Sequence, residues 1–163
     1  MAEAAIALHE ALLQRWDKQH KAGLAALQWY ASLCANNVEI DVRALQQLDH
    51  ARAQLAAAAE ALQALSDELH GWLRIQRRAC APGLVHEAVV VALGAQVELF
   101  AHEASVRHHV SATLSEDGAR AALLAWKARP FLSGTAMQRA QEALDVAVAL
   151  AERAEVEQRH KRA

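Results

Sequence analysis

Two histidines of this chain lie in a pattern that would place them inside the protein. Between residues 6 and 34, mostly apolar residues recur alternately every three and four positions, and the histidines belong to that series. Such spacing is typical of the helix face that packs against a partner helix. The series is Ile6, His9, Leu13, Trp16, His20, Gly23, Leu27, Tyr30 and Cys34. Because helical bundles can hold metal ions or haem through inward-facing side chains, this is the first chemistry to consider.

The other histidines do not complete a known metal motif. Di-iron bundles use paired Glu-x-x-His motifs, and this chain contains one, Glu157/His160. Asp-x-x-His pairs begin at Asp17 and Asp67, but a hairpin turning near Asn37 would separate them by roughly 20 Å. The C-x-x-C-H motif of c-type haem is missing. We therefore predict no cofactor and keep a metal ion or haem as the alternative.

Counting residues along the expected antiparallel helices places several polar residues at the same level of the bundle. If the third helix returns beside the second, His109 lies level with His20 and Glu98 level with His9. A last helix antiparallel to the third would bring Glu142 to the same layer as His20. The predicted ligand candidates are His9, Asp17, His20, His109 and Glu142.

A helical-wheel check changes one partner in this constellation. His109 shares a face with Glu98 and His102, and that face is polar. His108 falls on the apolar side, so we expect it to be the inward partner of His20. Two further residues on the apolar stripe, Glu103 and Arg107, have the i, i+4 spacing of an ion pair and are expected to be partly buried.

Simpler interpretations exist for each candidate. A core histidine that is hydrogen-bonded to a neighbouring helix explains His9 and His20 without a ligand, and a proton switch is a further alternative. Asp17 and Glu142 are most simply solvated or ion-paired.

The composition predicts an all-α fold. Of 163 residues, 54% are hydrophobic, many of them alanine, and only six glycines and two prolines interrupt the chain. We expect one domain over residues 1–163, an antiparallel bundle of four long helices plus one short helix. The four long helices are expected over 3–34, 41–79, 84–113 and 135–160. The short helix is expected to begin with Ser115 as its N-cap and to end before Pro130.

The second expected helix is long and carries leucine at every seventh position. Leu48, Leu55, Leu62 and Leu69 form this series. It predicts either a core stripe within the chain or the seam of a homodimer. Cys34 and Cys80 lie near opposite ends of this helix, so we expect two thiols rather than a disulfide.

Charge and hydropathy exclude some functions. The net charge is −2, which disfavours nucleic-acid binding. The N-terminus lacks the pattern of a signal peptide, and we expect no membrane span and a cytoplasmic location.

No catalytic motif stands out, so we expect a non-enzymatic helical-bundle module for protein interaction or signal relay, acting with a protein partner and as a homodimer. The alternative is a metal- or haem-binding bundle that acts as sensor or oxidoreductase through inward-facing histidines. A small enzyme with a buried histidine and Asp17 or Glu103 as an acid/base pair is a third class.

Overall fold

The computed structural model describes residues 2–36, 42–79 and 85–162, which form five helices and, within those ranges, no strand. The helices are α1 (Ala2–Asn36), α2 (Val42–Ala79), α3 (Val85–Ala112), α4 (Ala119–Ala128) and α5 (Thr135–Arg162). This confirms the predicted all-α fold of four long helices and one short helix. Cys80 lies outside the described residues, so its predicted position relative to Cys34 stays a prediction.

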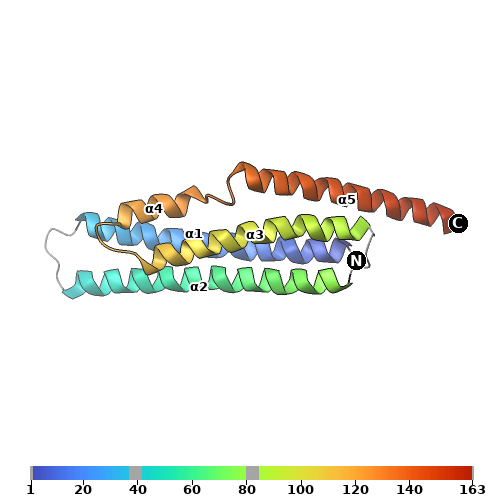
Figure 1. Ribbon diagram of the computed structural model, residues 1–163. Coiled ribbons are helices and arrows are strands. Elements are labelled where there is room, and N and C mark those ends of the chain that lie inside the picture. The colour runs from blue at the N-terminus through green and yellow to red at the C-terminus, as the bar shows by residue number, and fades with distance from the viewer. Residues whose placement is uncertain (1, 37–41, 80–84, 163) are drawn as a thin grey trace.

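The helices form an antiparallel bundle in which two successive helices, α4 and α5, share the fourth position (Figure 1). We call these two helices the fourth column. α1, α2 and α3 run side by side in alternating directions, and α4 and α5 follow each other along the remaining side. α4 packs mainly on α1, whereas α5 packs on α3. The C-terminal end of α5 extends past the other helices (Figure 1).

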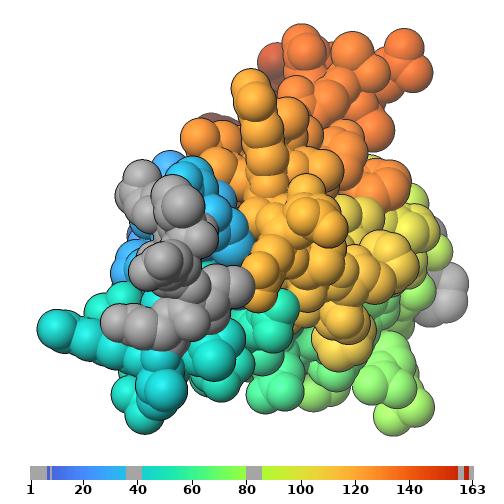
Figure 2. Space-filling view, turned by 90° about the vertical axis from the view of Figure 1, so that its left-hand side faces the viewer, coloured from blue at the N-terminus to red at the C-terminus, as the bar shows by residue number. Residues whose placement is uncertain are grey.

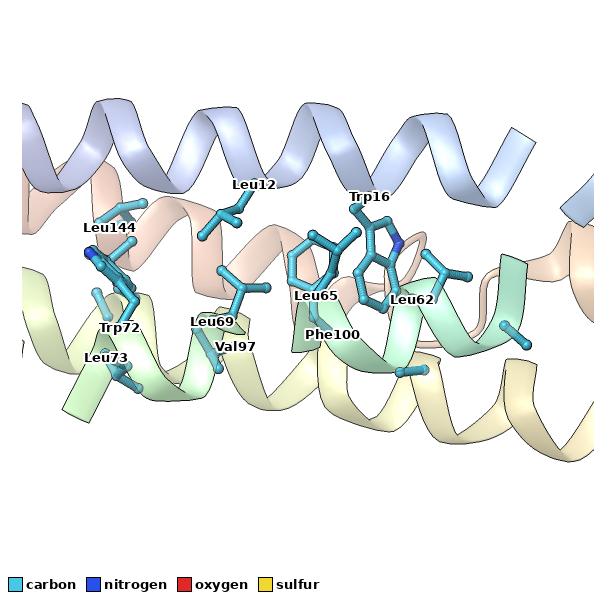
Figure 3. Packing of buried hydrophobic residues seen from close by; sticks show 14 of the residues in the cluster. Leu12, Trp16, Leu62, Leu65, Leu69, Trp72, Leu73, Val97, Phe100 and Leu144 are labelled. Carbon is cyan, nitrogen blue, oxygen red and sulfur yellow. The ribbon is translucent and has the colours of Figure 1, made fainter. Parts of the chain in front are cut away.

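The core follows the predicted helix faces. All four heptad leucines of α2 are at most 4% exposed, so this stripe is core within the single chain. Trp16 meets the edge of Phe100 with ring centroids 4.7 Å apart, between leucines of α1 and α2 (Figure 3). Buried alanines at 51, 58 and 59 allow close approach of the helices. The α1 series is buried or half-buried wherever its side chains are described.

The register between α1 and α2 differs from the predicted one. Arg15 pairs with Glu68 at 2.9 Å, whereas the predicted hairpin places Arg15 level with Ala59. The difference is about two and a half helical turns. Tyr30 shows the same offset, because its hydroxyl accepts a hydrogen bond from Arg52 at 2.8 Å. Interdigitation of the core side chains, rather than a symmetric hairpin, sets the register.

The connection between α4 and α5 breaks the fourth column where the sequence predicts it. Arg129 ends α4 in a left-handed conformation with φ 46° and ψ 57°. The backbone N–H groups of Leu132 and Ser133 both donate to the Arg129 carbonyl, at 3.0 and 2.9 Å. A Cβ atom on Gly134 would lie 3.3 Å from the Pro130 carbonyl oxygen. We call residues 129–134 the junction.

The predicted start of the short helix is wrong by one turn. α4 begins at Ala119, with Gly118 as its N-cap and no acidic residue in its first turn. The Ser115 hydroxyl instead accepts a hydrogen bond from the Gly118 N–H at 3.1 Å, so it stabilises the turn before the helix. In the view toward this end, the amber and orange segment that includes α4 lies between the blue end of α1 and the yellow end of α3 (Figure 2).

α3 is the most apolar helix. Its segment His86–Ala112 is long and apolar enough to cross a membrane by length and composition, and 56% of the apolar window is buried inside the bundle. Within the bundle α3 contacts α2, α5 and α4.

Candidate functional site

A buried polar cluster joins α4 to α1 and α3 beside the junction. Its centre is Trp126, which is fully buried. The indole N–H donates to the backbone carbonyl of His20 at 3.1 Å, and the indole stacks on the His20 ring with centroids 6.1 Å apart and an angle of 14°. We call His20, Glu103, Arg107 and Trp126 the clamp.

Arg107 and Glu103 form the charged half of the clamp. Their side chains are 0% and 1% exposed, and they form the ion pair that the i, i+4 spacing predicts. Arg107 also donates to the Ala125 carbonyl at 2.8 Å, and its guanidinium lies over the Trp126 ring, 5.0 Å from the centroid. The other Glu103 oxygen accepts a hydrogen bond from the Phe131 N–H at 3.0 Å. The pair therefore fixes both α4 and the junction to α3.

The pKa of His20 lies at about 4, well below its usual value. Burial is the main cause, and the positive charges of Arg129 and Arg107 add to it. Burial also lowers the pKa of Arg107. At neutral pH the clamp thus holds a neutral imidazole near the Glu103–Arg107 pair.

Asp17 lies at the solvent edge of this cluster. It pairs with Lys21 at 2.7 Å and with Arg129 at 3.6 Å, as expected for an ion-paired carboxylate. The hydrogen bond from Lys21 is the main cause of its lowered pKa, which burial opposes. Asp17 therefore connects α1 to the end of α4 rather than presenting a free ligand.

A glycine makes room for the clamp. A Cβ atom on Gly23 would lie 2.2 Å from Cζ2 of Trp126. The indole therefore packs directly against the backbone of α1. Gly23 belongs to the helix seam recognised in the sequence, but the sequence offered no sign of which side chain faces it.

His9 occupies a separate environment. Its side chain is 3% exposed and stacks on Trp72 with ring centroids 6.1 Å apart. Burial lowers its pKa, and Nε2 has no hydrogen-bond partner among the described atoms. His9 and His20 are eleven positions apart on one helix, about 16 Å along its axis, so they belong to different layers.

The remaining ligand candidates do not join either histidine. His108 is exposed, so its predicted inward position is wrong. Arg107, one position earlier, takes the buried place on the stripe, and His108 is turned outward by about 100°. His109 is exposed as predicted from its polar face, but it does not join a His20 site. No group of three or more metal-ligating side chains gathers within the described ranges.

Glu142 also lies elsewhere. It lines a groove between α3 and α5 together with Val91 and accepts a hydrogen bond from Gln138 at 3.0 Å. The prediction that it shares the His20 layer is wrong, because α5 packs beside the first half of α3, where Gln96 donates to Gln141 at 3.0 Å.

Exposed aliphatic side chains gather along this groove. It has a volume of about 580 Å³ and exposes three large aliphatic side chains, Val91 at 63%, Val146 at 61% and Leu150 at 50%. Its lining is Ala88, Val91, Ala92, Arg139, Glu142, Ala143, Val146, Ala147 and Leu150. We call these residues the α3–α5 groove.

Comparisons with known proteins give no relative: no protein family matches this chain, and no curated protein or solved structure is significantly similar to it.

Proposed function

We propose that this protein is a non-enzymatic interaction module and that the α3–α5 groove is its binding face. The observation that carries the proposal is the exposure of Val91, Val146 and Leu150 on one groove. Contiguous exposed aliphatic side chains, with charged residues among them, mark protein–protein contact sites. The long leucine stripe does not compete for this role because it is buried within the chain.

The clamp supports the same proposal in a structural role. Its hydrogen bonds and ion pair connect α1, α3, α4 and the junction, so they position α4 and the beginning of α5. Both buried imidazoles stack on tryptophan rings, which gives them a packing role in the core. We assign the clamp to scaffolding and the groove to recognition.

We place the module in the cytoplasm as part of this proposal. Cys34 is a free thiol, and burial raises its pKa. A free thiol suits a reducing compartment.

Site-specific photocrosslinking in cells tests the binding face. A photoreactive phenylalanine analogue at Val146 should form a covalent adduct with a protein. The control position is Leu124 on α4, which is 62% exposed and therefore as accessible as Val146 at 61%. An adduct at 146 and none at 124 supports the proposal, whereas no adduct at 146 overturns it.

A further inference from the structure

The outward side of α5 repeats a four–three spacing of its own. Ala143, Val146 and Leu150 form its apolar centre, and charged residues flank them at both ends. Every member of the series is exposed: Arg139, Ala143, Val146, Leu150, Arg153 and Glu157. A four–three series is what one helix presents to another in a two-helix seam.

This series is complementary to itself when two copies run in opposite directions. In the antiparallel register centred between Val146 and Leu150, each of these two residues meets the other on the second copy. The same register places Arg139 opposite Glu157 at both ends of the contact. A parallel arrangement would instead set Arg139 against Arg139. This register also sets Ala143 opposite Arg153. The Val146–Leu150 contacts at the centre and the Arg139–Glu157 pairs at the ends are therefore what favour the antiparallel orientation.

We propose that the occupant of the α3–α5 groove is a second copy of this chain, with its α5 packed antiparallel to the first. This inference rests on the proposed function, since it names the partner of the same face. The flanking charges are available for it, because Arg139, Arg153 and Glu157 form no ion pair within the described part of the chain. The contact is isologous, so it closes as a dimer with a twofold axis.

The size of the contact sets its strength. Residues 139–157 of α5 extend over about 27 Å, and two helices that meet over this length bury an area near the lower limit of about 1,000 Å² for a specific interface. We therefore expect a reversible dimer that dissociates in the micromolar range. The leucine seam of α2 has no part in it.

Sedimentation of the full chain over a range from a few to several hundred micromolar provides the first test. The wild-type protein should change from monomer to dimer within this range. Val146→Lys should remain monomeric, because a lysine would lie in the centre of the seam, and Leu124→Lys should dimerise as the wild type does. Both substituted side chains are exposed, and helical circular dichroism checks that the variants fold.

Charge reversal identifies the orientation. Arg139→Glu alone and Glu157→Arg alone each replace two attractive pairs in the dimer by two repulsive ones, which should raise the Kd roughly tenfold or more. Mixing the two variants should give a heterodimer in which both pairs are again attractive. The double variant Arg139→Glu/Glu157→Arg should dimerise like the wild type.

The outcomes separate this inference from the proposed function. A wild-type chain that stays monomeric throughout, or single variants that dimerise unchanged, overturns the antiparallel dimer. If crosslinks from position 146 then join a different protein, the binding face stands and its occupant is another molecule. If position 146 forms no crosslink, the proposed function falls as well.

Discussion

Replacing Gly23 by alanine tests the contact at the centre of the clamp. A Cβ atom there would lie 2.2 Å from Cζ2 and 2.9 Å from Cη2 of Trp126, whereas carbon atoms in favourable contact are about 3.5–4.0 Å apart. The indole is rigid, buried and hydrogen-bonded to the His20 carbonyl. Accommodation of the methyl group therefore requires α4 to move outward or Trp126 to leave its place.

The expected magnitude follows from two opposing effects. Overpacking of a buried site costs about 1–3 kcal/mol, and displacement of Trp126 would weaken a hydrogen bond that contributes about 1 kcal/mol. Alanine in a helix is favoured over glycine by about 0.5–1 kcal/mol. The net expectation for Gly23→Ala is a loss of about 1–3 kcal/mol in the free energy of unfolding, or roughly 3–10 °C in Tm.

Gly71 provides the matched control, since it lies in the interior of α2 and a Cβ atom there would meet nothing within 4 Å. Gly71→Ala should stabilise the chain by about 0.5–1 kcal/mol. Urea unfolding followed by circular dichroism at 222 nm measures both variants. In a Trp126→Phe background the smaller ring leaves space, so the penalty for Gly23→Ala should shrink.

A Gly23→Ala variant as stable as Gly71→Ala would refute this reasoning. It would mean that α4 does not pack against the backbone of α1 at this point. An unchanged penalty in the Trp126→Phe background would instead show that the penalty arises from another neighbour.

Three further predictions concern the buried polar groups. Because the pKa of His20 is lowered, the unfolded chain binds more protons between about pH 6.5 and 4, and the free energy of unfolding should fall as the pH drops through this window. His20→Leu should weaken this decline. An equal decline in the unfolding curves of the variant would contradict its origin in His20. Arg107→Met leaves the Glu103 carboxylate buried without its partner and should lower the free energy of unfolding by about 3–5 kcal/mol. The double variant Glu103→Gln/Arg107→Met should lose less than this single variant. Additive losses in urea unfolding would count against a coupled pair. Protein purified without a histidine tag should contain no stoichiometric metal and show no Soret band, since both buried imidazoles stack on tryptophan. One equivalent of iron or zinc that is lost in His9→Leu or His20→Leu would favour the metal- or haem-binding alternative.

Local patterns in the sequence predicted those features that depend on one helix. The buried face of α1, including His9 and His20, follows from its spacing, as do the leucine stripe of α2 and the Glu103–Arg107 pair. Proline and glycine marked the junction because their backbone preferences act locally.

Features that depend on two helices could not be predicted in this way. Trp126 contacts His20, more than a hundred positions away in the chain, and no local signal links the two residues. Helix register has the same origin, because it depends on which side chains interdigitate across the core. The predicted register between α1 and α2 is wrong by about two and a half turns. Arg107 of α3 nevertheless lies beside His20 in the clamp, and His109, two positions later, stays apart because it is exposed. Glu142 does not reach this layer, because Gln141 next to it pairs with Gln96 in the first half of α3.

The division of the fourth column into α4 and α5 gives its two halves unequal resistance to local unfolding. α4 is anchored by a buried tryptophan and by hydrogen bonds to two other helices. The face that α5 buries is mainly small, namely Ala140, Leu144, Ala147 and Ala151. With no continuous run of helical hydrogen bonds across residues 129–134, opening of α5 need not spread into α4. We therefore expect α5 to open more readily than α4, and such opening would loosen the helix that carries the exposed Val146, Leu150 and Val156.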